Sequence, residues 1–258
     1  MVGKFGEMAK LTLINRRKQA AALDTQKVGY LYFRNTSTDM QRKIAIVVGG
    51  TGLVGTALLE QLVADSRYSE IVSVGRRKPT VESPKITHFD NDLTSPKTAA
   101  EHLFGDDLFI CIGTTIHKAK TQEAFKFVDL TIPKKIAKHA RKNGVKNVAL
   151  VSSVGANSKS NNFYLKTKGK AEKAVVEHDF EKTVIVRPSL LLGHRKEFRF
   201  FESIWRGMSG FANLFMQGSW RKYRSVQASQ VAKAMIYYIN TDQKGVDFFT
   251  YDQIIRAK

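Results

Sequence analysis

Short runs of apolar, mostly β-branched residues alternate along the chain with longer segments in which apolar residues recur every three or four positions. The short runs predict buried strands at 44–48, 71–74, 86–89, 108–112, 147–151 and 183–187. The longer segments predict helices at 53–65, 121–142, 164–178 and 228–239. Alternation of this kind, without internal repeats, predicts a doubly wound α/β fold: a parallel sheet covered by helices on both faces. Pro133 falls inside one helical segment and either starts its second half or kinks it.

Residues 1–42 precede the first predicted strand and look like an extension of the domain. They carry a basic triplet at 16–18 and three acidic side chains. We expect a flexible tail or a start codon assigned too early, with Met40 as the true start. An organelle-targeting arm is the alternative, because such arms are rich in arginine and poor in acidic residues. Residues 43–258 are expected to form one domain, since an α/β fold of this length buries a full core without disulfides or metals.

The charge balance is strongly basic, with 42 lysines and arginines against 23 acidic residues and a formal net charge of +19. The cations are spread along the chain, which favours a generally basic surface. Nucleic acid is therefore not an expected partner, and a membrane surface is a weak alternative. Cys111, the one cysteine, falls in an apolar run and is expected to be buried. Because no disulfide framework exists and no apolar run approaches the roughly 20 residues that cross a bilayer, we expect a soluble, cytoplasmic protein.

A glycine-rich turn joins the first predicted strand to the first predicted helix. Gly49, Gly52 and Gly55 allow a sharp turn, a close approach of the backbone to a diphosphate and close packing of the helix on the sheet. The N–H groups at the start of the helix can then bind phosphate. Such a turn alone is a modest signal, but between a strand and an amphipathic helix it predicts dinucleotide binding. The other contacts expected from this turn are Thr51, Leu53 and Val54.

Two arginines, Arg76 and Arg77, follow the second predicted strand. In a site for NAD, an acidic residue about 20 positions past the glycines binds the adenosine ribose. Guanidinium groups pair instead with a 2′-phosphate. The sequence therefore predicts NADP(H) as the cofactor, with solvated turn residues as the alternative.

Other strand ends point to the same crevice, because ligands of such sheets bind beyond the carboxyl ends of the strands. Asp92 and Leu93, after the third predicted strand, are expected at the adenine. Ile112, Gly113 and Thr114, after the fourth, are expected along the ribose and nicotinamide. Each of these is also compatible with an ordinary turn. No metal site is expected.

Tyr164 and Lys168 lie four residues apart in a predicted helix, so they share a face. A neighbouring ammonium favours the phenolate, so Tyr164 can exchange a proton with a carbonyl or alcohol group. Ser153, or its neighbour Ser152, ends the fifth predicted strand and is expected to polarise that carbonyl. Outside this context, the helical pair would be ordinary surface residues. The backbone contacts expected at the nicotinamide carboxamide, after the sixth predicted strand, are Arg187 and Pro188.

This ordered set resembles the short-chain dehydrogenase/reductase superfamily over nearly all of residues 43–258, which implies a Rossmann fold. The sequence segments 74–77, 111–115 and 163–169 are similar to those of the atypical members typified by the Tat-interacting-protein oxidoreductases. These members are grouped with nucleoside-diphosphate-sugar epimerase-like proteins. The resemblance implies NADPH binding and is compatible with a homodimer, since such proteins often pair through long helices.

Two departures from the superfamily pattern bear on the chemistry. The turn at 112–114 replaces the superfamily's Asn-Ala-Gly, and Asp129 stands where typical members carry a catalytic asparagine that holds a water in the proton relay. Whether Asp129 replaces that asparagine is open from the sequence.

Residues 195–224 are rich in aromatic and basic side chains and are expected to form a small C-terminal lobe over the substrate, by analogy of fold. Such a cleft suits an anionic or partly hydrophobic small molecule; the core of the lobe and a membrane-binding surface are the alternatives. We thus expect an NADPH-dependent oxidoreductase of the short-chain type, acting on a carbonyl or alcohol. The rivals are a sugar-nucleotide epimerase or dehydratase and a non-catalytic NADPH-responsive binding protein.

Overall fold

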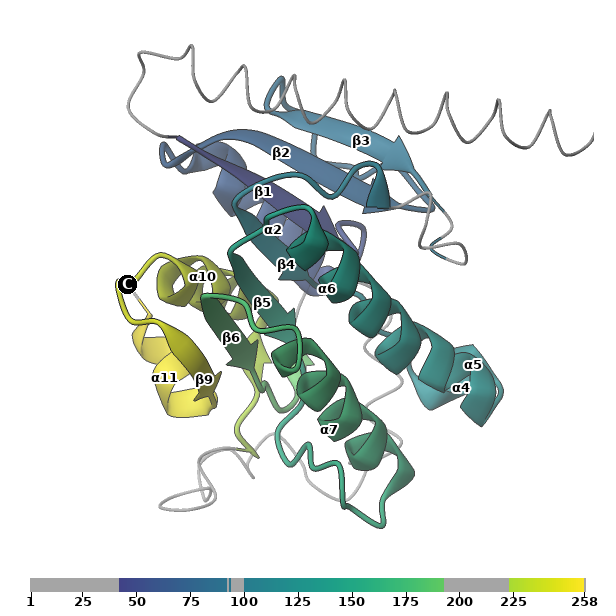
Figure 1. Ribbon diagram of the computed structural model, residues 1–258. Coiled ribbons are helices and arrows are strands. Elements are labelled where there is room, and N and C mark those ends of the chain that lie inside the picture. Colours follow the sequence, from purple (N-terminus) through teal and green to yellow (C-terminus); the bar gives the residue numbers. More distant parts are fainter. Residues whose placement is uncertain (1–41, 92, 94–99, 193–222, 258) are drawn as a thin grey trace, which may run out of the picture. The chain divides into compact units, whose positions relative to one another are not determined.

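The computed structural model describes residues 42–91, 93, 100–192 and 223–257, and the described residues from Lys43 onwards form one compact unit. Seven strands build a sheet in which every neighbouring pair is parallel (Figure 1). In sheet order the strands are β3 (Ile86–Asp90), β2 (Tyr68–Gly75), β1 (Lys43–Val48), β4 (Asp107–Ile110), β5 (Asn147–Val151), β6 (Lys182–Val186) and β9 (Gly245–Phe249). The order reverses between β1 and β4, which is where ligands bind in open sheets of this kind.

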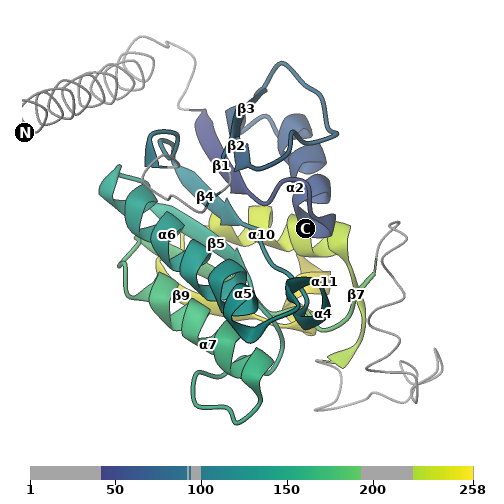
Figure 2. The same ribbon diagram turned by 90° about the vertical axis from the view of Figure 1, so that its right-hand side faces the viewer.

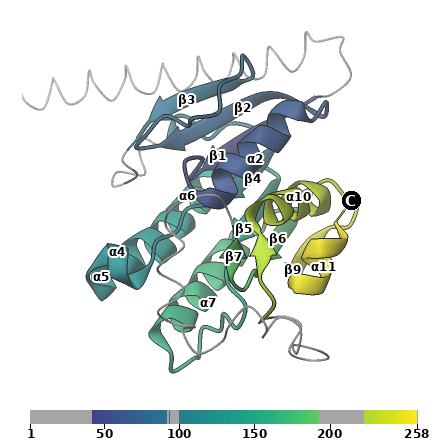
Figure 3. The same ribbon diagram turned by 180° about the vertical axis from the view of Figure 1, so that it is seen from behind.

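Helices cover both faces of the sheet. On one face lie α6 (Ile132–Lys142) and α7 (Phe163–Val176), side by side (Figures 1 and 2). On the other face lie α2 (Leu53–Ala64) and α10 (Ala228–Ile239), which pack against each other (Figure 3). The predicted doubly wound α/β fold is confirmed. No helix among the described residues is both long and apolar enough to span a bilayer.

The central strands form as predicted because their apolar runs are buried on both faces of the sheet. β3, which was also predicted as a buried strand, lies at the edge of the sheet and has no buried residue. In β1 all residues from Ile44 to Val48 are buried, and β6 is buried throughout. On the α2 and α10 face, Leu58 and Met235 are fully buried in one continuous core with strand residues such as Val47. This core fixes the central strands, and with them the loops at their carboxyl ends.

The structure adds elements that the pattern of apolar residues did not predict. β9 is an edge strand followed by α11 (Tyr251–Arg256), and a separate parallel pair joins β7 (Leu191–Leu192) to β8 (Val226–Gln227). The predicted helix 121–142 is divided into α5 (Gln122–Lys126), a π-helical turn (Phe127–Thr131) and α6. Pro133 lies in the first turn of α6, where a missing N–H costs little, so it starts the second half of the predicted helix.

A buried polar network ties the sheet together at the end away from the glycine turn. The Asp107 carboxylate, fully buried, accepts hydrogen bonds from Tyr68 Oη (2.6 Å), Asn147 Nδ2 (2.7 Å) and Lys43 Nζ (3.1 Å). Asn240, the C-cap residue of α10, donates to the Tyr68 hydroxyl at 2.9 Å. Burial and the neighbouring Asp107 carboxylate raise the pKa of Tyr68, which keeps its hydroxyl a donor. Because each partner comes from a different element, the network joins β1, β2, β4, β5 and the C-terminal end of α10.

Candidate cofactor and proton-transfer site

The glycine turn after β1 has a shape that side chains would prevent. Gly49 has φ of 91°, and a Cβ there would lie 2.7 Å from Ile112 N and 2.8 Å from the Cys111 carbonyl carbon. A Cβ on Gly55 would lie 2.1 Å from Gly49 O, so only glycine lets α2 approach the turn. The turn is closed by a hydrogen bond from Gly52 N to Gly49 O (3.0 Å). The three glycines therefore bring β1, α2 and the β4 turn into direct backbone contact.

The N-terminus of α2 leaves its first N–H groups open to a ligand. Gly52 is the N-cap residue and offers no side-chain acceptor, and the first turn contains no acidic residue. The unpaired N–H groups and the helix dipole both favour an anion at this position. The residues of this turn therefore fit the diphosphate of a dinucleotide. The remaining predicted contacts, Thr51, Leu53 and Val54, lie in the same turn and the start of α2.

The cations predicted to select the cofactor follow β2 directly. Arg76 and Arg77 are both exposed, and neither forms an ion pair within the described part of the chain. At the neighbouring strand end, Leu93 is buried at φ of 61°, and its N–H donates to Asn91 Oδ1 at 2.8 Å. Asp92 lies outside the described residues. Two free guanidinium groups beside the glycine turn are available to a phosphate.

A buried ion pair lies beside the β4 turn. Lys168 Nζ is 2.7 Å from Asp129 Oδ1, and the two side chains are 9% and 0% exposed. The other carboxylate oxygen, Oδ2, accepts a hydrogen bond from Thr114 N at 2.8 Å. A Cβ on Gly113 would lie 3.3 Å from Asp129 Oδ1 and 3.6 Å from Lys168 Nζ, so the backbone of the turn lies directly against the ion pair. Asp129 thereby links the predicted nicotinamide turn to the predicted catalytic helix.

The surroundings of Lys168 keep it cationic. Burial by itself would lower the pKa of Lys168, but the Asp129 carboxylate, Tyr164 and Glu172 together raise it above its ordinary value. Lys168 is therefore an ammonium across the neutral pH range. Tyr164, one helical turn before Lys168 on α7, lies within the field of this charge.

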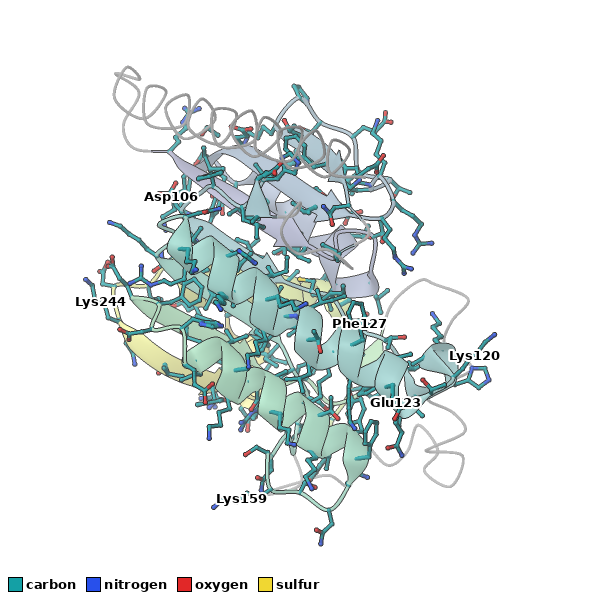
Figure 4. All side chains as sticks on the ribbon, turned by 45° about the vertical axis from the view of Figure 1, so that its right-hand side comes forward. Asp106, Lys120, Glu123, Phe127, Lys159 and Lys244 are labelled. Atoms are coloured by element: carbon teal, nitrogen blue, oxygen red, sulfur yellow. The ribbon has the colours of Figure 1, made fainter. Side chains whose placement is uncertain are left out.

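The π-helical turn Phe127–Thr131 is what directs Asp129 inward. The N–H of Ile132 bonds to Phe127 O, five residues back, so the turn is wider than an α-helical one. Pro133 follows at once and has no N–H for a regular helical bond to the Asp129 carbonyl. In Figure 4 the labelled residues Glu123 and Phe127 mark the path from α5 into this turn. Widened turns of this kind are frequent at functional sites.

Aromatic packing holds the Tyr164 ring. The ring of Phe125, fully buried, lies 5.6 Å from the ring of Tyr164 and 5.6 Å from that of Phe163. Tyr164 is only half-buried, and its hydroxyl makes no hydrogen bond to another described residue. The phenol is thus fixed through its ring while its hydroxyl stays available to a substrate.

The two serines at the end of β5 differ in their surroundings. Ser153 is half-buried, and its hydroxyl donates to Val154 O at a long 3.3 Å. Ser152 is 6% exposed, and its Oγ is buried with no hydrogen-bond partner among the described residues. The hydroxyl of Ser153 is therefore the more accessible to a substrate.

Arg187, at the end of β6, has its side chain occupied within the protein. Its guanidinium makes a bidentate contact with Glu172 of α7, at 2.8 Å and 2.6 Å, and lies 4.3 Å from the Phe248 ring centroid. Only its backbone is left for the predicted cofactor contact. Pro188 is buried, and its carbonyl accepts from Val154 N at 2.9 Å, which joins the β6 end to the serine loop.

Sequence reasoning missed two charged partners at this site. Asp129 is predicted only as a relay residue, not as the counter-ion of Lys168, and Glu172 is not among the predicted residues. The signal for Glu172 was present, since it stands four residues after Lys168 on the same helical face. Asp129 carried no comparable signal, because its contact with α7 is long-range.

A family model described as NAD(P)H-binding matches residues 49–203, beginning at the first glycine of the turn. The chain belongs to this NAD(P)H-binding family. Two curated relatives extend the similarity. Protein FMP52, mitochondrial, of Lodderomyces elongisporus is 34% identical over 212 residues, which cover 78% of this chain and 88% of the relative. Protein HTATIP2 of Rattus norvegicus is 32% identical over 201 residues, 76% and 81% of the two chains, and confirms the resemblance drawn from the sequence.

The fold also has close counterparts among solved structures. The structure titled MoeE5 in complex with UDP-glucose and NAD aligns with a TM-score of 0.61 over 81% of this chain and 79% of that chain. Its sequence is 16% identical, so this likeness concerns the fold. The chain therefore has an NAD(P)H-binding fold of the type seen in that NAD complex.

The expected cytoplasmic location is wrong. The FMP52 relatives are named mitochondrial proteins, which points to mitochondria. The expectation rested on the single cysteine and the lack of an apolar span, and neither feature distinguishes one reducing compartment from another. The segments 1–42 and 195–224, predicted as an extension and a substrate-covering lobe, lie almost entirely outside the described residues.

Proposed function

We propose that this protein is an NADPH-dependent oxidoreductase that transfers a hydride between the nicotinamide and a carbonyl or alcohol substrate. The observation that carries the proposal is the arrangement on α7: Tyr164 stands one turn before Lys168, and Asp129 holds Lys168 against Gly113. This group lies beside the β4 turn, whose backbone also meets Gly49. A proton donor and the dinucleotide cradle thus share one end of the sheet.

The residues that would hold the cofactor are supplied by four strand ends. The glycine turn and the N-terminus of α2 would bind the diphosphate. Arg76 and Arg77 would pair with the 2′-phosphate, which supports NADP(H) over NAD(H). The backbone at Gly113 and Pro188 would flank the nicotinamide, which supplies or accepts the hydride when it is bound.

The proton chemistry follows from the protein's own groups. Tyr164 donates a proton to the carbonyl oxygen, or removes one from an alcohol in the reverse direction. The Lys168 ammonium stabilises the phenolate that results. Ser153 donates a hydrogen bond to the same oxygen and holds it towards the phenol, and its accessibility supports it over Ser152. Asp129 keeps Lys168 in place and charged.

Replacing Tyr164 tests this mechanism. In a screen of carbonyl substrates followed by NADPH absorbance, Tyr164→Phe is expected to lower kcat by at least about 100-fold, because the proton donor is lost. NADPH affinity should change less than about threefold, since the ring and Lys168 remain. Tyr237→Phe, a half-buried tyrosine on α10, is the matched control and should keep full activity.

Three other outcomes would contradict the proposal. Undiminished turnover in Tyr164→Phe would remove the phenol from the mechanism. A cofactor that is tightly retained, with turnover but no net NADPH consumption, would indicate an epimerase or dehydratase cycle instead. A failed substrate screen together with cofactor-dependent capture of a partner would favour a non-catalytic NADPH-responsive protein.

For the substrate, we propose an anionic or partly hydrophobic small molecule, on the basis of the aromatic and basic composition of residues 195–224. We also propose a mitochondrial location, supported by the names of the fungal relatives and by the basic composition of residues 1–42. Fractionation of cells that express the full chain tests the location, and recovery in the cytosol alone would contradict it.

A further inference from the structure

The two helices on one face of the sheet share an unusual surface. Every exposed residue of α6 and α7 is a lysine. We call this set the lysine face, and its members are Lys134, Lys135, Lys138, Lys142, Lys166, Lys170 and Lys173. The helices of the opposite face differ, because α2 exposes Glu60 and Ala64, and α10 exposes Ser229 and Lys233. The charge is therefore concentrated on one side of the sheet.

The lysine face is continuous across the two helices. Figure 1 shows α6 and α7 side by side, and Figure 4 views the same pair with its side chains. His178, just after α7, contacts the Lys134 carbonyl at 3.1 Å, and Arg141 Nε donates to Asp179 O at 2.9 Å. These bonds join the end of α7 to α6.

Few carboxylates balance this charge. α6 contains no acidic residue, and Glu172, the one acid of α7, is buried against Arg187. Within the described residues the face makes one ion pair, between Lys173 and Glu177 at 3.9 Å. The uncompensated positive charge also acts on His139. Burial lowers the pKa of His139, and the nearby Lys142, Lys138 and Lys135 lower it further.

A second copy of the chain does not fit this face. Two copies related by a twofold axis would bring the same patch together, lysine against lysine. A dimer through these helices, which the family resemblance allows, is therefore disfavoured by charge. An ordinary protein partner fits poorly as well, because lysine is depleted at interface cores and this face exposes no aromatic or aliphatic anchor.

The side-chain types also argue against sequence-specific and single-stranded nucleic acid. Sequence-specific contacts use bidentate arginine, and single strands stack on aromatic rings, whereas every exposed residue of α6 and α7 is a lysine. An anionic bilayer needs only cations near its plane, with no insertion and no directed hydrogen bonds. The composition of the face matches that requirement.

We propose that the lysine face docks the protein on a membrane surface rich in anionic phospholipid. Each lysine near such a surface strengthens binding about fivefold, so seven on one face suffice for reversible attachment. The attachment is electrostatic and is weakened by salt. It does not depend on cofactor or turnover, so it stands apart from the proposed enzymatic function.

Vesicle co-sedimentation of the full chain tests the proposal. The probe is phosphatidylcholine vesicles with about 30% phosphatidylserine, compared with pure phosphatidylcholine. The Lys138→Gln/Lys170→Gln variant removes one central lysine from each helix and should bind roughly 30-fold more weakly. The control variant, Lys233→Gln/Lys244→Gln, removes the same charge elsewhere and should bind less than about twofold more weakly.

Each outcome decides the matter. Selective loss in the face variant, together with no binding to pure phosphatidylcholine, supports the proposal. Equal loss in both variants would mean that only net charge matters, and would overturn it. Absence of binding to the anionic vesicles would overturn it too. Displacement from vesicles by duplex DNA at equal phosphate concentration would assign the face to nucleic acid instead. Circular dichroism of both variants verifies that neither has unfolded.

Discussion

Removing the counter-ion of Lys168 is the sharpest test of the site, because the pair is buried and its partners are known. Asp129→Ala leaves an ammonium that is 9% exposed without its paired carboxylate, and leaves Thr114 N without its acceptor. Asp129→Asn is the milder change. Its one amide oxygen can accept from Thr114 or face Lys168, but cannot do both.

The expected loss follows from the burial of the two groups. Breaking a buried ion pair by removing one partner costs about 3–5 kcal/mol, since the remaining charge stays desolvated. For a chain of this size, each kcal/mol shifts Tm by about 2–4 °C, so Asp129→Ala should melt roughly 6–20 °C lower. Because the pKa of Lys168 is raised in the folded state, this stabilisation is complete at neutral pH and is lost only as the pH rises through that elevated pKa.

Urea unfolding of a double-mutant cycle measures the coupling. Asp129→Ala, Lys168→Met and their combination should be non-additive, with the double variant more stable than Asp129→Ala alone, because it leaves no unpaired charge. Glu177→Ala is the control, since it removes an exposed pair on the same helix worth about 0.3–0.5 kcal/mol. Additivity of the two site variants within about 0.5 kcal/mol would refute the buried pair.

Three further predictions concern the turn, the arginines and the cysteine. In fluorescence titrations, the double variant Arg76→Ala/Arg77→Ala should bind NADPH roughly 10- to 100-fold more weakly, because charged hydrogen bonds to the 2′-phosphate are lost. Its NADH binding should be unchanged. Equal loss of affinity for both cofactors would refute the proposed selectivity. Gly55→Ala should prevent dinucleotide binding and lower Tm, since its Cβ would lie 2.1 Å from a backbone oxygen, whereas Gly75→Ala meets nothing within 4 Å and should not lower Tm. Cys111, expected from the sequence to be buried, is only partly buried, and desolvation raises the pKa of its thiol to about 12, so at pH 8 the folded chain should react with iodoacetamide more slowly than the urea-unfolded chain; equal rates would contradict the raised pKa.

Most of the fold could be predicted because its central strands are buried on both faces. The predicted strand 147–151 and helix 228–239 have the observed bounds, since burial produces unbroken apolar runs and helical spacing. β9 was missed for the opposite reason. As an edge strand it exposes Val246 and Phe248, at 42% and 44%, and shows no buried run. The π-helical turn was not predicted either, because one wide turn hardly changes the spacing of apolar residues along the sequence.

The site could be predicted only where its residues are neighbours in the sequence. The i, i+4 spacing predicted that Tyr164 and Lys168 share a face of one helix, which α7 shows. The Asp129 carboxylate reaches Lys168 from a different helix, and local periodicity carries no information about such contacts. The predicted cytoplasmic location was wrong because it rested on cysteine usage and on the lack of a long apolar run. Proteins of several compartments share both features.

The π-helical turn Phe127–Thr131 makes the site sensitive to chain length as well as to residue type. Deleting one residue there would restore an even helical pitch, yet it would rotate the preceding residues by about 100° relative to α6. The carboxylate would then swing away from α7 although every side chain near the ammonium had been kept. When related chains are aligned, a one-residue gap at this place should therefore be counted as loss of the counter-ion, even where the aspartate itself is retained.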